Sequence, residues 1–430
     1  MNILFIACYS PLINNSASIE TLMYLNNLAS IKDVKVTLLT VDFPKTSIYY
    51  DEEILKMLNK DVEIHKLSGG KLFNKIMPKK SIEPLEVKID SNTKGNKKNN
   101  IQLLRKIKNK IIFPDMYYNW SKKASEYGIN LVREKNIDII FSMHEPPSSH
   151  LCALKIKKQF KNIPWITYWS DPWMKDSTRE DIGFLRKSIE GNMERKVVDN
   201  SDKFIFVTRE NAEDFKRTYN IDDKRVFLIN RGYDEDTYID LLKEDIPSKI
   251  KNDKINIVYA GEIFKKLRDI NPFVDSIYWL KENEREIYNN LNILFFGNID
   301  DEEAKEKLSS LENVEVSGRI PFKEALKYML NSEILLIFGN KNSKQIPAKI
   351  YDYFGTDGFI EVILGDEKDP LRIITEGKEK CEVTINKKQY IVKSLKILID
   401  KVLKGEKSKR LEEYEWKNVS KKLYSILKGE

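Results

Sequence analysis

The strongest constraint on the fold is a regular alternation along the chain between short apolar runs and longer amphipathic stretches. Parallel strands need a connection of about a dozen residues or more, usually a helix. The alternation therefore predicts an α/β architecture of parallel strands with crossover helices. The predicted strands cover residues 3–7, 34–40, 137–141, 164–168 and 203–207, and then 255–259, 291–296, 314–317, 334–338 and 359–364.

The alternation pauses once in the middle of the chain. Asn230-Arg231-Gly232-Tyr233-Asp234 and a charged stretch running to Lys254 separate the first set of apolar runs from the second. A chain of 430 residues also exceeds the usual size of a single core. We therefore predict two α/β units joined near residues 235–254.

Composition indicates the cellular compartment in which the chain folds. The balance of 41% hydrophobic and 32% charged residues indicates buried cores rather than disorder. Cys8, Cys152 and Cys381 lie far apart, so we expect neither a disulfide framework nor a zinc site. The first residues lack the pattern of a secretory leader, and no apolar run reaches the roughly 20 residues that span a bilayer. We expect a cytoplasmic protein, with any membrane contact peripheral, at the inner face of the cell membrane.

A basic stretch follows the polar residues 94–100. Between residues 101 and 112, isoleucines and leucine recur near helical spacing while Arg105 and lysines occupy other faces. Two interpretations stay open: a surface helix packed on the first sheet, or a helix that contacts an anionic membrane surface. We expect no nucleic-acid partner, because the net charge of +7 comes from basic residues interleaved with acidic ones and no recognised module accompanies them.

Two strand ends in the first half carry side chains suited to chemistry. His144 ends an apolar run and precedes Glu145-Pro146, and Asp171 follows the next run just before Pro172-Trp173. Ligands bind at the carboxyl ends of parallel strands, where imidazole and carboxylate can bind sugar hydroxyls or move protons. A packed structural histidine and a turn-forming aspartate are the alternative interpretations.

Two segments of the second half suggest an anion site. Gly261 lies just after the run 255–259 and before Lys265, Lys266 and Arg268, which could neutralise a diphosphate. Further on, Pro347 can open a helix whose free N–H groups bind anions, with Asp352 placed to bind ribose hydroxyls. Solvated helix starts are the alternative for both segments.

Seven motifs share one order and spacing with a known family. They are Phe113-Pro114-Asp115 with Trp120, His144-Glu145-Pro146, Ser170-Asp171-Pro172-Trp173, Ile229-Asn230-Arg231-Gly232-Tyr233-Asp234, Tyr259-Ala260-Gly261, Ser317-Gly318-Arg319-Ile320-Pro321 and Pro347-Ala348-Lys349-Ile350-Tyr351-Asp352-Tyr353. Over essentially the whole chain, this set resembles the family 4 retaining glycosyltransferases of GT-B fold, the type that builds bacterial surface polysaccharides. The resemblance implies two Rossmann-like domains facing each other across a cleft.

The resemblance also implies how the work is divided between domains. Residues 1–235 would form the acceptor side, completed by a returning C-terminal helix at about 410–430, and residues 250–405 would bind a nucleotide-diphosphate sugar, UDP or GDP most often. The acceptor would be a saccharide or a lipid-linked sugar, and no metal or other cofactor would be needed. The resemblance places His144 near the transferred sugar. From their positions at strand ends, the candidate catalytic residues are His144 and Asp171, with Glu145 and the aromatic Trp173 toward the acceptor. The implied donor-binding residues are Gly261, Lys266, Arg268, Arg319, Ile320, Lys349 and Asp352.

The sequence departs from the family pattern at three places. Residues 14–18 replace a glycine pair after the first strand, Lys344 stands where the family has the first acidic residue of a Glu-x(7)-Glu element, and Asp352 is shorter than its second glutamate. Asp234-Glu235-Asp236 resembles a metal-binding triplet, but its place in the crossover argues against that role. Two rival functions stay open. One is a sugar-nucleotide epimerase of the same fold, and the other, suggested by Lys344 and the missing glycine pair, is a non-catalytic partner subunit that has lost donor binding.

Overall fold

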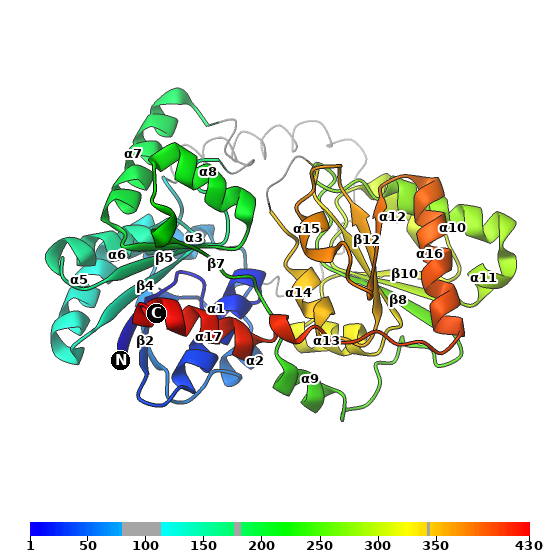
Figure 1. The fold of residues 1–430 in the computed structure, drawn as a ribbon, viewed down its shortest axis with the longest axis horizontal. Coiled ribbons are helices and arrows are strands. Elements are labelled where there is room, and N and C mark those ends of the chain that lie inside the picture. Colours follow the sequence, from blue (N-terminus) through cyan, green and yellow to red (C-terminus); the bar gives the residue numbers. More distant parts are fainter. Residues whose placement is uncertain (80–112, 176–181, 342–344) are drawn as a thin grey trace. The chain divides into compact units, whose positions relative to one another are not determined.

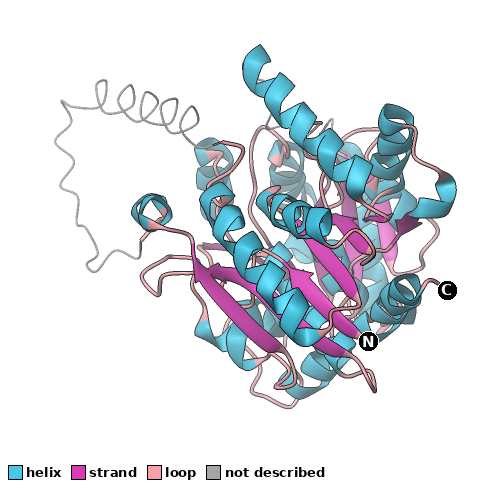
Figure 2. Cartoon of the chain, turned by 90° about the vertical axis from the view of Figure 1, so that its left-hand side faces the viewer, coloured by secondary structure: helices cyan, strands magenta, loops and turns pink. Residues whose placement is uncertain are grey.

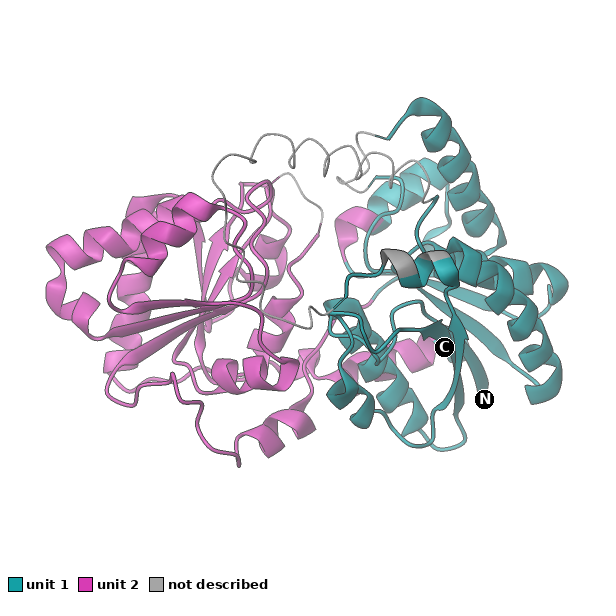
Figure 3. Cartoon of the chain, turned by 180° about the vertical axis from the view of Figure 1, so that it is seen from behind, with its two compact units in different colours: residues 1–207, 212–228, 427–430 teal, residues 208–211, 229–426 magenta. Residues whose placement is uncertain are grey.

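The computed structural model describes residues 1–79, 113–175, 182–341 and 345–430. The basic stretch 101–112 and Lys344 lie outside these ranges. The chain divides into two compact units, which are described one at a time (Figure 3). Unit 1 comprises residues 1–207, 212–228 and 427–430, and unit 2 comprises residues 208–211 and 229–426.

Unit 1 is built on a parallel sheet of seven described strands in the order β3-β2-β1-β4-β5-β6-β7 (Figure 1). All five strands predicted in this half are confirmed, and β3 and β7 were missed. Both are edge strands with mostly half-exposed residues, so they lack the continuous apolar run of a buried parallel strand. The strands are β1 (Asn2–Ile6), β2 (Lys35–Asp42), β3 (Glu63–Ser68), β4 (Ile139–His144), β5 (Trp165–Trp169), β6 (Lys203–Phe206) and β7 (Val226–Leu228).

Helices cover both faces of this sheet (Figure 2). Along one face α5 packs on α6, and α6 packs on α7. Their apolar residues share one core with Leu4 and Ile6 of β1 and Trp165 of β5. The helices are α1 (Ser16–Ala29), α2 (Glu52–Lys56), α3 (Lys71–Ile76), α5 (Tyr118–Lys135), α6 (Ser148–Gln159), α7 (Phe184–Asn200) and α8 (Arg209–Tyr219).

Unit 2 holds a second parallel sheet, of six described strands in the order β10-β9-β8-β11-β12-β13. Its five predicted strands are confirmed, while β13 was missed because most of its residues are only half-buried at the sheet edge. The strands are β8 (Ile255–Ala260), β9 (Leu291–Phe296), β10 (Val314–Ser317), β11 (Ile334–Phe338), β12 (Phe359–Leu364) and β13 (Cys381–Ile385).

The helices of unit 2 enclose a separate core. Helix α10 packs on α16, and their apolar faces join residues of β8, β9 and β11 in a second cluster. The helices are α9 (Glu235–Leu241), α10 (Asn271–Asn283), α11 (Arg285–Asn289), α12 (Glu302–Ser309), α13 (Phe322–Leu330), α14 (Lys349–Phe354), α15 (Leu371–Thr375), α16 (Lys388–Leu403) and α17 (Trp416–Lys428). None of the helices in the described ranges is long and apolar enough to cross a bilayer.

Each sheet has a point where the winding of the chain reverses. In unit 1 this switch point lies between β1 and β4, and in unit 2 it lies between β8 and β11. Open parallel sheets bind ligands beyond the carboxyl ends of the strands at such a point. Topology therefore directs the search to two places, the carboxyl edge of unit 1 and the carboxyl edge of unit 2.

Candidate functional site

The carboxyl edge of unit 2 opens because β8 and β11 diverge. These strands pair only at Ile257 with Ile334 and at Val258 with Leu335, whereas β8 pairs with β9 along its whole length. Beyond those pairs, the Tyr353 hydroxyl from α14 bridges the two strands. It accepts a hydrogen bond from the Ala260 N–H (3.4 Å) and donates one to the Leu336 carbonyl (3.3 Å).

Glycines let the backbone pack closely at this edge. Gly297 follows β9 with φ of +118°, and a Cβ atom there would lie 2.1 Å from the Gly261 carbonyl oxygen. Gly339 follows β11, and its Cβ would lie 1.7 Å from Asp369 Oδ2. No larger residue fits either position. Sequence reasoning chose Gly261 and missed the other two, although both stand in the same Phe-Gly-Asn sequence directly after a strand.

Arg268 holds the loop after β8 against the end of β11. Its Nε donates to Asn340 Oδ1 (2.9 Å), and its Nη1 donates to the Glu262 carbonyl (2.6 Å) and the Tyr259 hydroxyl (3.2 Å). These bonds fix the half-buried guanidinium at the carboxyl edge. Lys266 lies exposed on the same loop.

Lys349 and Asp352 pair on α14. The distance between Lys349 Nζ and Asp352 Oδ2 is 3.4 Å, and Tyr238 donates to the Asp352 backbone carbonyl (3.2 Å) and to Oδ1 (3.5 Å). The Asp352 side chain is 17% exposed, and burial raises its pKa although Lys349 and Tyr238 oppose the shift. The helix begins at Lys349 rather than at Pro347, whose carbonyl accepts the Ile350 N–H (3.2 Å).

Further contacts bring the predicted donor-binding residues of unit 2 into one neighbourhood. Arg319, beside Ile320 in the turn after β10, lies 3.6 Å through Nε from Glu262 Oε1, next to Gly261. The Lys349 amine lies 5.5 Å from the ring centroid of Phe322, which follows the same turn. The cationic groups expected to bind a diphosphate thus surround the ends of β8 and β11, and their individual roles stay predictions.

His144 ends β4 at the carboxyl edge of unit 1, as expected, but its ring is enclosed. The side chain is 5% exposed and stacks on Trp169, with ring centroids 5.5 Å apart. Glu145, the next residue, is half-buried. Burial raises the pKa of Tyr9, which lies in the loop after β1, and the negative charge of Glu145 raises it further. His144 and Glu145 therefore lie at the switch point, with the imidazole packed among aromatic rings.

Asp171 and Trp173, both in the turn after β5, differ in how accessible they are. Asp171 is half-buried, and no group in the described ranges donates a hydrogen bond to its carboxylate. The expectation that Trp173 faces the acceptor is corrected, because this residue is fully buried and its indole N–H donates to Glu190 Oε2 (2.8 Å). Trp173 is thus a packing residue whose ring surface is not available to a sugar.

A buried network that sequence reasoning missed joins the turn after β5 to the turn after β4. Glu190 on α7 also pairs with Arg186 (2.6 Å), whose Nη2 donates to the Pro114 carbonyl (3.0 Å). The next residue, Asp115, accepts from the Ser148 N–H (3.0 Å) and hydroxyl (2.7 Å) and so caps α6, which has no cap of its own. The only sequence signal for Glu190 was a carboxylate in a helix with weak amphipathic character.

Two segments that the sequence singled out, residues 14–18 and the Asp234-Glu235-Asp236 triplet, have local structural roles. Asn15, in the segment that replaces the glycine pair, caps α1 by accepting the Ser18 N–H (2.8 Å). In the Asp234-Glu235-Asp236 triplet, Asp234 accepts from Thr237, and Asp236 pairs with Lys417 (3.1 Å). In the described part of the chain, no three histidine, cysteine or acidic residues gather as metal ligands would.

Comparison with known proteins finds one family model that matches part of the chain, and solved structures with a similar fold. Residues 87–237 match the model of the family described as Glycosyltransferase Family 4. No curated protein sequence matches the chain.

Solved structures resemble the whole chain at low identity. A sucrose-phosphate synthase from Thermosynechococcus elongatus has a TM-score of 0.62 at 11% identity, covering 100% of this chain and 98% of its own. A UDP-GlcNAc 2-epimerase from Neisseria meningitidis, bound to UDP-GlcNAc, has a TM-score of 0.60 at 11% identity, with both chains covered fully. WaaG, a glycosyltransferase involved in lipopolysaccharide biosynthesis, has a TM-score of 0.56 at 13% identity, with both chains covered fully. These similarities confirm a GT-B fold of two α/β units.

Proposed function

We propose that this protein is a glycosyltransferase that moves a sugar from a nucleotide-diphosphate donor to an acceptor. The observation that carries the proposal is the cationic neighbourhood at the switch point of unit 2, formed by Arg268, Lys349 and the exposed Lys266. The match of residues 87–237 to a glycosyltransferase family supports the same activity from the other half of the chain.

The donor would bind to unit 2 through three groups of contacts. Arg268, Lys266 and Lys349 would neutralise the diphosphate and stabilise it as it departs, which is why we propose transfer without a metal ion. Asp352 would bind the ribose hydroxyls, and the turn at Arg319 and Ile320 would contact the base. A UDP- or GDP-sugar is the proposed donor.

The acceptor would use unit 1. His144 ends β4 and Asp171 follows the adjacent strand β5, and the Ser170 hydroxyl donates to the His144 carbonyl (2.6 Å), so the two turns are fixed to each other. The Asp171 carboxylate, which accepts no hydrogen bond from the described residues, would accept a hydroxyl proton of the acceptor, while His144 would steady the developing charge. We propose transfer with retention to a saccharide or lipid-linked acceptor in cell-surface polysaccharide synthesis, in the cytoplasm at the inner membrane face.

A second candidate is a sugar-nucleotide epimerase, since a UDP-GlcNAc 2-epimerase shares the fold over its full length. Such an enzyme would use the same donor contacts without needing an acceptor. The transferase is favoured because the family match lies in residues 87–237, the half that contains His144 and Asp171.

The test begins with calorimetric titration of UDP-, GDP- and dTDP-sugars into the purified chain, with and without chelator. Asp352→Ala should weaken binding of the preferred donor by about 1 to 3 kcal/mol, or about 5- to 150-fold, because hydrogen bonds to the ribose are lost. Asp253→Ala, which removes an exposed carboxylate of the same unit, is the matched control. Unchanged donor affinity in a folded Asp352→Ala variant would remove Asp352 from the site.

Product analysis then separates transfer from epimerisation. With donor alone, an epimerase interconverts the sugar, whereas a transferase releases little product until acceptor is added. A full rate without acceptor would refute the transferase, and activity that disappears in chelator and returns with magnesium would refute metal independence.

A further inference from the structure

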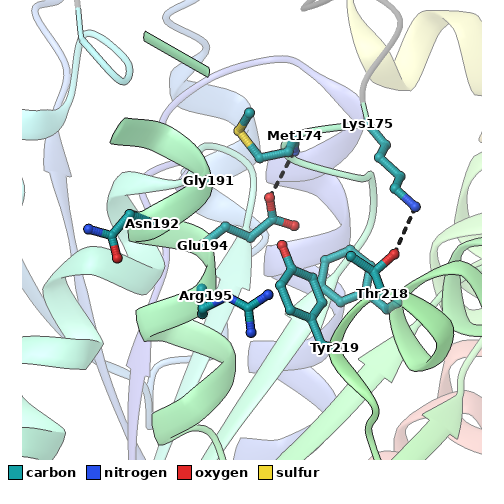
Figure 4. A pocket seen from close by; sticks show the side chains of 9 residues that line it. Met174, Lys175, Gly191, Asn192, Glu194, Arg195, Thr218 and Tyr219 are labelled. Atoms are coloured by element: carbon teal, nitrogen blue, oxygen red, sulfur yellow. Dashed lines mark hydrogen bonds between the residues drawn. The ribbon is translucent and has the colours of Figure 1, made fainter. Parts of the chain in front are cut away.

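A cavity of about 410 Å³ lies in unit 1, between α7, α8 and the residues that follow the Asp171 turn (Figure 4). Its volume is within the range of about 300 to 1,000 Å³ that is usual for small-molecule sites. Phe215 of α8 and Met174 supply apolar surface, while α7 supplies Glu194 and Arg195 to the polar lining. None of these residues takes part in the donor site proposed above.

A glycine opens one wall of this cavity. Gly191 lies in the middle of α7, where glycine costs about 1 kcal/mol relative to alanine. No atom lies within 4 Å of the position that its Cβ would occupy, so no packing neighbour requires the missing side chain. The absence of a side chain at this position leaves room for a ligand.

Glu194 forms the polar floor of the cavity. Glu194 is 2% exposed, and its carboxylate accepts the Met174 N–H (3.1 Å; Figure 4). The carboxylate also accepts a hydrogen bond from Tyr219. A carboxylate has about four acceptor positions and donates nothing when ionised. A ligand that contacts it must therefore donate hydrogen bonds, as sugar hydroxyls do.

Arg195 gives the cavity a positive rim. Its guanidinium carbon lies 5.3 Å from the Tyr219 ring centroid, and in the described ranges it makes no ion pair or hydrogen bond. Consecutive residues of a helix point about 100° apart, so Arg195 and Glu194 contact different ends of a ligand. The Lys175 amine is already engaged, by Thr218 (2.8 Å) and Asp214 (2.9 Å), which leaves Arg195 to bind an anionic group.

We propose that this cavity binds a sugar unit carrying a carboxylate or a phosphate, as part of the acceptor. Its ring would pack on Phe215 and Met174, its hydroxyls would donate to Glu194, and its anionic group would pair with Arg195. Asp171 is three residues from Met174, a span of at most about 11 Å. A neighbouring sugar of the same acceptor can therefore reach Asp171; this last step rests on the proposed function.

The experiment titrates the full chain with methyl glucuronide, glucose 6-phosphate and methyl glucoside, followed by saturation-transfer NMR. At least one anionic sugar should bind 10-fold or more tightly than the neutral one, and comparing the two identifies the preferred group. Arg195→Gln should remove this preference, and Gly191→Leu should abolish binding of all three sugars by filling the cavity. Lys196→Gln, on the same helix but outside the cavity lining, is the control and should change nothing.

Equal affinity for neutral and anionic sugars would overturn the proposal, as would no binding at about 10 mM. Binding that is unchanged in Arg195→Gln and Gly191→Leu would place the sugar elsewhere and overturn it too. The same variants should bind nucleotide sugars as the wild type does, because the donor residues lie in unit 2. Failure of nucleotide-sugar binding in the wild type would refute the proposed function instead, so the two failures are distinguishable.

Discussion

Lys380 offers a prediction whose size follows from the structure. This lysine is almost fully buried at the start of β13, and its amine donates to the carbonyls of Phe354 (3.2 Å) and Thr356 (2.8 Å). Phe354 is the last residue of α14, so the amine supports the carboxyl end of the helix that carries Asp352. Burial lowers the pKa of Lys380 from its usual 10.5 to about 8.

This lowered pKa links stability to pH with a definite sign. Between pH 8 and 10.5 the unfolded chain keeps a proton on Lys380 that the folded chain has released, so the free energy of unfolding rises with pH in this window. Each pKa unit corresponds to about 1.4 kcal/mol, so the whole window contributes about 3 kcal/mol. Below pH 8 the amine is protonated in both states and the dependence ends.

The assay compares wild type with Lys380→Met, because other titrating groups cancel in the difference. Urea unfolding at pH 7.5 and at pH 9.5 should show that the wild type gains about 2 kcal/mol relative to the variant. Lys393→Met removes an exposed lysine of α16 and should show no such change. The relevant transition is the one that Lys380→Met shifts, since two units can unfold separately.

A difference between wild type and Lys380→Met that stays constant over this pH range would refute the reasoning. Such a result would mean that water reaches the Lys380 amine despite its hydrogen bonds to the two carbonyls. Nucleotide-sugar titration at pH 7.5 adds a functional readout. Loosening of α14 in Lys380→Met should weaken donor binding, whereas Lys393→Met should leave it unchanged.

Three further predictions test other parts of the chain. His144→Ala should cut turnover per folded molecule about 100-fold or more with donor affinity intact, and near-normal turnover would make His144 a packing residue only. Burial raises the pKa of Glu361, so the stability that this residue contributes in its protonated form is lost as the pH rises above about 4.5. Glu361→Gln should therefore raise the melting temperature at pH 7, and an unchanged melting temperature would contradict this. Replacing Lys106, Lys108 and Lys110 with Gln should reduce sedimentation with anionic liposomes at low salt, and equal sedimentation would exclude a membrane role for residues 101–112.

Sequence reasoning predicted the two sheets well because buried parallel strands are continuous apolar runs. Ile334–Phe338 and Phe359–Leu364 are buried at every position, and no polar residue except Glu361 interrupts them. The missed strand Glu63–Ser68 has only half-exposed and exposed positions and lies at a sheet edge. Pairing with a neighbouring strand, rather than its own composition, makes such a segment a strand.

The candidate site was only partly predictable, because sequence places a residue at a strand end without giving its direction. Gly261 and Arg268 do lie at the edge that α14, the helix with Asp352, also contacts, since topology brings the strand ends together. Trp173 was assigned to the acceptor because aromatic rings stack on sugars. Its indole N–H instead donates a hydrogen bond to the buried Glu190, 17 residues later, so the ring is held in the core. That partner depends on helix packing, which local pattern does not reveal.

The two carboxyl edges share a topology but differ in chemistry, and the difference agrees with the proposed division of work. The edge of unit 2 presents guanidinium and ammonium groups fixed by backbone carbonyls and acidic partners, an arrangement suited to a multiply charged diphosphate. The edge of unit 1 presents Asp171 beside stacked aromatic rings, with the Arg195 cavity next to it. Such a surface favours uncharged sugars, or sugars with a single carboxylate or phosphate group, over a diphosphate. Substitutions in unit 2 should therefore act mainly on donor affinity, and those in unit 1 on turnover and acceptor affinity.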